Sequence, residues 1–190
     1  MLLLALSAHA SSLPAGPHAL QAAQFGPAAA TAFPPPRTAL PPPTPGPDMR
    51  VYGYLAYWAN DLSTVPWDDL TDIAIFSVGA NADGSLGATG NWDIADEAVA
   101  LAAPYGVRVH LCVTQFDDGT LATLLSSATN RNRLIDELVD WEASTGVHGV
   151  NIDFENLPYE VKQEMVDFTR DLDAVVGDVV LATPSVDWAG

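Results

Sequence analysis

The stretch GVNIDFE, residues Gly149 to Glu155, decides both the fold and the candidate chemistry of this chain. Apolar and polar residues alternate along it, as in a β-strand, whose successive side chains point to opposite faces. One face carries the apolar residues Val150, Ile152 and Phe154. The other face carries the polar residues Asn151, Asp153 and Glu155. Because the turn-forming segment 156–158 (NLP) follows, the strand is expected to end near Glu155.

An amide and two carboxylates on one face of a buried strand are costly unless they are solvated, paired or used in chemistry. Successive same-face Cα atoms of a strand lie roughly 6.5–7 Å apart, so the side chains of Asp153 and Glu155 can lean together and form a hydrogen bond. One carboxyl group can then hold a proton beside the other, as an acid catalyst working near neutral pH requires. The pair therefore indicates general acid–base chemistry.

This stretch resembles the catalytic strand of the family 18 glycoside hydrolases, the chitinase-like enzymes, whose signature is Asp-Gly-x-Asp-x-Asp-x-Glu. Glu155 stands at the final Glu of that signature, and Asp153 stands at the Asp two positions before it. His148 replaces the first Asp and Asn151 replaces the second. The resulting Asn-x-Asp-x-Glu resembles the spore-cortex and cell-wall branch of the family.

The resemblance implies a hydrolase of β-1,4-linked N-acetylglucosamine polymers, either chitin or the glycan of peptidoglycan, whose substrate supplies its own nucleophile. It assigns the general acid–base role to Glu155, the orientation of the substrate's acetamido group to Asp153, and the support of Asp153 by a hydrogen bond to Asn151. It implies neither a metal nor an organic cofactor. Two alternatives stay open: the two acids cap a strand end in solvent, or the chain is a non-catalytic, lectin-like glycan-binding member of the same fold.

Apolar strand-like runs alternate with helical patterns from Val51 onward, which is typical of βαβ units and a parallel sheet. The expected strands cover residues 51–58, 72–78, 107–113, 149–155 and 179–184. The expected helices cover residues 93–105, 130–145 and 158–176. Five such units, with acids at the carboxyl end of a strand, predict the first five β/α units of a (β/α)8 TIM barrel.

A full barrel of this type needs about 250 residues. We therefore expect residues 49–190 to be the N-terminal part of a family 18 barrel and the chain to be a fragment of a longer enzyme. By itself, the chain is then expected to show little or no activity.

Residues 1–48 have a different composition, because eleven of the fifteen prolines lie before Asp48. This segment is expected to be an Ala/Pro-rich disordered linker without a core. Residues 1–10 resemble the end of a secretory signal with Ala8-His9-Ala10 as its cleavage site, which predicts a protein that is secreted or held in the cell envelope. An Ala-rich disordered leader is the alternative. No stretch is long enough to predict a membrane span.

Composition argues against several classes of partner. The formal net charge of −17 opposes binding to nucleic acid or anionic lipid and suits a neutral polysaccharide, although a salt-adapted surface explains the charge equally well. Cys112 is the single cysteine, so no internal disulfide can form, and it is expected to be a small core residue. The four histidines lack the spacing of metal ligands. The oligomeric state stays open.

Aromatic residues near strand ends are the remaining candidates for the site. Tyr54 and Trp58 lie near the carboxyl end of the first expected strand, and Trp188 follows the fifth. At the carboxyl ends of barrel strands these rings could stack on sugar rings, so all three are candidate substrate-binding residues. The alternative is that they fill the barrel or pack under its helices.

Overall fold

Five parallel strands form one sheet in the structure of this protein, a computed structural model that describes residues 49–182. The strands lie side by side in chain order, and each pairs in parallel with the next. They are β1 (Tyr52–Ala56), β2 (Asp72–Gly79), β3 (Arg108–Gln115), β4 (Gly149–Phe154) and β5 (Val179–Leu181). This sequential parallel order confirms the predicted α/β class and is the strand order of a partial TIM barrel.

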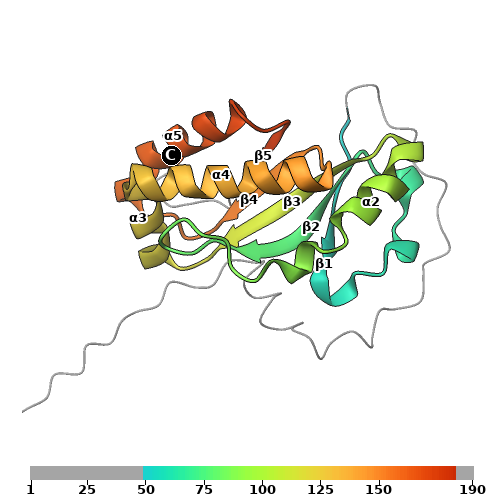
Figure 1. Cartoon of the computed structure of the whole chain (residues 1–190), viewed down its shortest axis with the longest axis horizontal. Coiled ribbons are helices and arrows are strands. Elements are labelled where there is room, and N and C mark those ends of the chain that lie inside the picture. The colour runs from blue at the N-terminus through green and yellow to red at the C-terminus, as the bar shows by residue number, and fades with distance from the viewer. Residues whose placement is uncertain (1–48, 183–190) are drawn as a thin grey trace, which may run out of the picture.

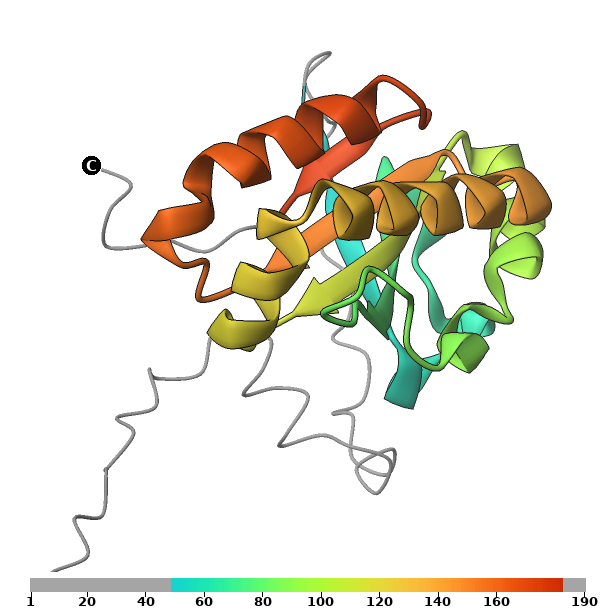
Figure 2. The same cartoon turned by 60° about the vertical axis from the view of Figure 1, so that its left-hand side comes forward.

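Helices connect the strands and lie along one face of the sheet (Figures 1 and 2). The α-helices of the described range are α2 (Ala95–Ala102), α3 (Asp118–Ser126), α4 (Ala128–Thr145) and α5 (Lys162–Asp173). Its 3-10 helices are η1 (Tyr57–Ala59), η2 (Leu62–Thr64), η3 (Trp67–Asp69), η4 (Thr89–Trp92), η5 (Ala103–Tyr105) and η6 (Tyr159–Val161). None of the helices in residues 49–182 has the length and apolar character needed to cross a membrane.

The strands divide the protein into two apolar regions because their side chains alternate between faces. The main core lies between the sheet and the helices, and β2, β3 and β4 supply it with aliphatic side chains. These include Ile73, Ile75, Val109, Leu111, Val113, Val150 and Ile152. A smaller cluster of Ala74, Phe76 and Cys112 belongs to the opposite set of strand positions, the inner face of the curved sheet. Because one set of alternating strand positions is buried under the helices, the other set must point to the inner face.

The predicted elements are largely confirmed, with two corrections. The first strand ends at Ala56 rather than at residue 58, because Tyr57 and Trp58 wind into η1. Helix α3 was not predicted, since its sequence DGTLATLLS is rich in small and hydroxyl residues that disfavour helices. It forms because Asp117 caps it, accepting a hydrogen bond from the Thr120 N–H, and because its three leucines are buried.

Several predictions concern residues outside the described range. They are the secretory signal, the Ala/Pro-rich linker over residues 1–48, residues 183–184 of the expected fifth strand, whose described part ends at Leu181, and the substrate-binding role of Trp188. The boundary between a linker and a barrel domain near residue 49 also stays a prediction.

Candidate active site

Asn151 and Asp153 lie at inner-face positions of β4, and Glu155 directly follows the strand at the next position of the same alternation. Their positions follow from the apolar residues between them, because Ile152 and Phe154 pack into the helix-side core. Asn151 and Asp153 are fully buried, and Glu155 is 1% exposed. The two acids therefore do not cap a strand end in solvent. Burial makes the electrostatic interactions of these groups stronger than they would be in water.

Asn151 connects β4 to two other strands. The Tyr54 hydroxyl donates a hydrogen bond to Asn151 Oδ1 over 3.5 Å, and Asn151 Nδ2 donates to the Val180 carbonyl over 3.4 Å. Burial raises the pKa of Tyr54 to about 12, so the phenol keeps its proton at neutral pH and is the donor. In the described part of the chain the hydrogen bonds of Asn151 go to these two groups, and a bond to Asp153 stays a prediction.

Small polar side chains of β2 and β3 lie beside the acids. Thr114 is the register partner of Asp153, and its hydroxyl lies 3.3 Å from that of Ser77. Cys112 is the register partner of Asn151. Burial, and secondarily the negative charge of Asp153, raises the pKa of the Cys112 thiol. This thiol is therefore neutral, which agrees with the small core residue predicted from the sequence.

His148, at the place of the first Asp of the signature, binds backbone rather than the acids. Its ring Nδ1 accepts a hydrogen bond from the Val109 N–H over 3.1 Å, and the backbone N–H of His148 donates to the Val109 carbonyl over 2.8 Å. The ring therefore ties the start of β4 to β3.

Two of the three candidate sugar-binding aromatics lie around Phe76 on the inner face. The Tyr54 ring is 6.2 Å from Phe76 and the Trp58 ring is 5.9 Å from it, both edge to face. Tyr54 is 40% exposed, and Trp58 is partly buried in η1. The structure thus brings both rings to the face that carries the acids. Their role in sugar binding stays a prediction, and Trp188 lies outside the described residues.

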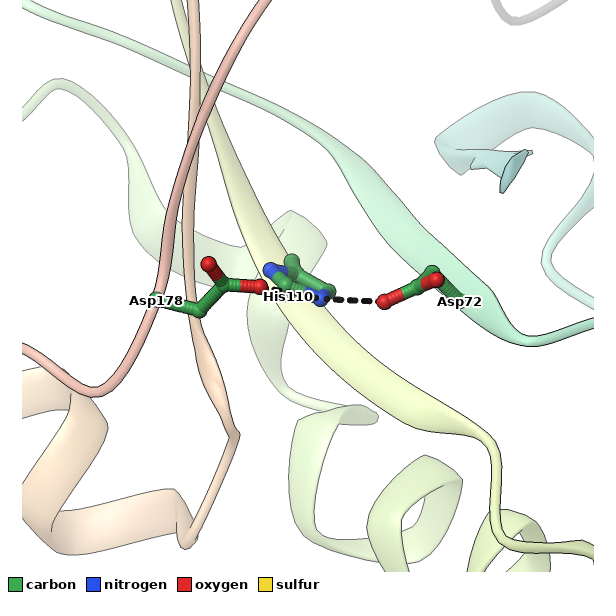
Figure 3. Close-up of side chains that lie close together, drawn as sticks. All are labelled: Asp72, His110 and Asp178. Atoms are coloured by element: carbon green, nitrogen blue, oxygen red, sulfur yellow. Dashed lines mark hydrogen bonds and ion pairs between the residues drawn. The ribbon is translucent and has the colours of Figure 1, made fainter. Parts of the chain in front are cut away.

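One group of side chains in residues 49–182 has the composition of a metal site: Asp72, His110 and Asp178 (Figure 3). His110 Nε2 lies 3.2 Å from Asp72 Oδ1 and 4.0 Å from Asp178 Oδ2. Sequence spacing could not reveal this group, since its members come from three distant segments. The sequence did contain a sign of the group, because Asp72 and His110 are polar residues near the start of otherwise apolar strands.

Two arginines form ion pairs with the carboxylate oxygens that would have to bind a metal ion. Arg50 and Arg108 both approach Asp72 Oδ1 and Asp178 Oδ2, at distances between 2.6 and 3.1 Å. A divalent cation would have to displace two guanidinium groups and tolerate their positive charge close by. The residues present therefore do not fit a metal centre.

The sequence matches no protein-family model and no curated protein, whereas many solved structures share the fold. One is a chitinase from Bacteroides thetaiotaomicron, with 22% identity, a TM-score of 0.62, and a match over 70% of this chain and 45% of that one. Another is the spore cortex-lytic enzyme SleL from Bacillus cereus, with 20% identity, a TM-score of 0.57, and a match over 70% and 34% of the two chains.

A family 18 chitinase from Cycas revoluta, solved in complex with (GlcNAc)4, matches with 18% identity and a TM-score of 0.56, over 65% of this chain and 39% of that one. The chain spans less than half the length of each of these three structures. Sequence identities of 18–22% support a shared fold and nothing more specific. The described part of the chain therefore has the fold of a part of the chitinase-like barrel of glycoside hydrolase family 18.

Proposed function

We propose that this protein is, or is part of, a glycoside hydrolase that cleaves β-1,4-linked N-acetylglucosamine polymers. The observation that carries the proposal is the burial of Asp153 and Glu155 at the carboxyl end of β4, with Asn151 buried two residues before Asp153 on the same face. In barrels of this kind, the carboxyl ends of the strands form the active site. The fold shared with chitinases and with a spore cortex-lytic enzyme supports the same class of reaction.

The proposed mechanism uses the substrate's 2-acetamido group in place of a protein nucleophile. Its carbonyl oxygen attacks the anomeric carbon while the glycosidic C–O bond breaks, and Glu155 gives its proton to the leaving oxygen. The product of this step is an oxazolinium ion. Glu155 then takes a proton from the water that attacks the anomeric carbon, so the sugar is released with its configuration retained.

Asp153 accepts a hydrogen bond from the acetamide N–H, which orients that group and offsets its developing positive charge. Asn151 contributes an amide where a third carboxylate would add another negative charge. Its bonds to Tyr54 on β1 and to the Val180 carbonyl on β5 link β4 to both of these strands. Tyr54 and Trp58 are the proposed sugar-stacking residues within the described range, and Trp188 is proposed with them.

Chitin and the glycan of peptidoglycan both contain the acetamido group that this mechanism requires, so both are proposed substrates. Either polymer would be met outside the cytoplasm, which agrees with the secretory leader predicted for residues 1–10.

The test is the release of chromophore from a chromogenic chitobioside, with the matching cellobioside as control, in a polypeptide long enough to close the barrel. The cellobioside carries a hydroxyl in place of the acetamido group, so it cannot form the oxazolinium ion. We expect turnover of the first compound only. Equal turnover of both would contradict the substrate-assisted mechanism, and binding without turnover would identify a lectin-like protein.

A further inference from the structure

A second polar cluster, built around the buried side chains of Asp72 and His110, lies at the end of the sheet opposite the acids. Arg50 precedes β1, Asp72 begins β2, Arg108 begins β3 and Asp178 precedes β5. The guanidinium group of Arg50 donates to both Asp72 oxygens, at 3.0 and 2.6 Å, and to Asp178 Oδ2 at 3.1 Å. Arg108 contacts the same two carboxylates at 2.9 and 3.1 Å. Every charged group in the cluster therefore touches both groups of the opposite sign.

The charges of this cluster balance, since two guanidinium groups face two carboxylates. Burial by itself would raise the pKa of Asp72, but hydrogen bonds from Arg50, Thr71 and His110 and the charge of Arg108 hold it well below its usual range. Burial lowers the pKa of His110 despite the neighbouring Asp72. The imidazole is therefore neutral near pH 7 and donates its Nε2–H to Asp72.

The segment that carries Asp178 is packed directly on the start of β4. The Asp178 carbonyl accepts a hydrogen bond from the Val150 N–H over 2.9 Å. The backbones approach so closely at Gly149 that a Cβ there would lie 2.1 Å from the Asp178 oxygen. Two residues further on, Asn151 pairs with Val180 and donates to its carbonyl. The position of Asp178 thus determines how β5 lies against the strand that carries the acids.

We propose that Arg50, Asp72, Arg108 and Asp178 form an electroneutral clamp, which fixes β5 against β4 and so acts as a positioning device for Asn151 and Asp153. The two guanidinium groups supply the positive charge that a divalent cation would supply in a metal centre. The clamp itself is independent of the proposed function. Only its effect on turnover rests on that function.

The test is amide hydrogen exchange at the β4–β5 pairing in Asp178→Ala, which keeps the backbone and removes one charge of the clamp. The reporters are the Val150 amide, bonded to the Asp178 carbonyl, and the Ala182 amide, bonded to the Ile152 carbonyl. Both should exchange at least about tenfold faster, because the variant lacks the carboxylate through which Arg50 and Arg108 hold the start of β5. Asp171→Ala is the matched control, since it removes an aspartate whose pair with Arg170 is exposed. It should leave both amides unchanged.

If Asp178→Ala does not fold, Arg108→Lys replaces it, because lysine keeps the charge but lacks the planar fork with which Arg108 reaches Asp72 and Asp178 through two different nitrogens. A smaller acceleration at the same two amides is then expected. Exchange no faster than in the control would overturn the clamp. A metal-dependent result would also overturn it: Zn²⁺ or Mn²⁺ raises the Tm of the unmodified protein by several degrees but does not change the Tm of Asp178→Ala. The cluster would then be a metal site. Neither readout requires hydrolytic activity, so failure of the clamp and failure of the proposed function are distinguishable.

Discussion

The Tyr54 hydroxyl on β1 reaches Asn151 Oδ1 on β4 over 3.5 Å. Two strands lie between β1 and β4 in the sheet. In a flat sheet, three spacings of roughly 4.8 Å each would separate them. The contact therefore crosses the hollow of a sheet that curves as a barrel wall does, and it lies on the face that carries the candidate acids.

We predict that Tyr54→Phe lowers the stability of the protein by about 0.5 kcal/mol, the lower end of the range for a hydrogen bond because this one is long. The ring stays in place, so any stacking on sugar is kept and KM for a chitobioside should change little. Tyr57→Phe is the control, since it also removes one tyrosine hydroxyl and keeps a ring that packs edge to face on Trp58 at 4.7 Å. It should change the stability less than Tyr54→Phe does. Denaturant unfolding measures both variants. A large rise in KM for Tyr54→Phe would show that the hydroxyl binds substrate directly.

Asp153→Asn should reduce kcat and change the shape of the pH–rate profile, because Glu155 loses a neighbouring negative charge. Asn151→Ala should be milder, since it removes supporting hydrogen bonds worth about 0.5–1.5 kcal/mol each. The pH dependence of chitobioside turnover measures both. If Asn151→Ala proved more damaging than Asp153→Asn, the assigned order of roles along β4 would be wrong.

Asp72 of the clamp and His110, which contacts it, should make stability pH-dependent in the same direction. The pKa of His110 is lowered by burial, so the unfolded chain binds the proton more readily and stability should fall as pH drops through about 6.5. The pKa of Asp72 is also lowered in the folded protein, so its contribution is present above about pH 4 and is lost at more acid pH. Unfolding by urea at a series of pH values measures this. In His110→Gln the slope between pH 7 and 5 should become shallower, and an unchanged slope would contradict the assignment.

The fold could be predicted from the sequence wherever burial imposes a clear period. The alternation along residues 149–155 predicts β4 and its polar face, because one slip of register would bury the opposite set of side chains. Helix α3 could not be predicted in this way, since its small and hydroxyl residues have weak helical preference and its burial depends on tertiary contacts.

The candidate site could be predicted where its residues share one strand or lie near the carboxyl end of a strand, as Tyr54 and Trp58 do. Asn151, Asp153 and Glu155 are close in sequence, so local alternation places them on one face. The clamp joins residues as far apart as Arg50 and Asp178, which are 128 positions apart. Only the folded sheet brings them together. Asp72 and His110 did carry a signal, because each is a polar residue at an inward position of an apolar strand.

The central claim is that Glu155 is the general acid and base, and the most direct test is the turnover of a chromogenic chitobioside by Glu155→Gln in a polypeptide long enough to close the barrel. Glu160→Gln, an exposed residue of the neighbouring η6, is the matched control. Loss of the group that transfers the proton should lower kcat at least about 10²-fold in Glu155→Gln. Glycan binding should survive, and the control should be unaffected. Turnover by Glu155→Gln close to that of the unmodified enzyme would contradict the account.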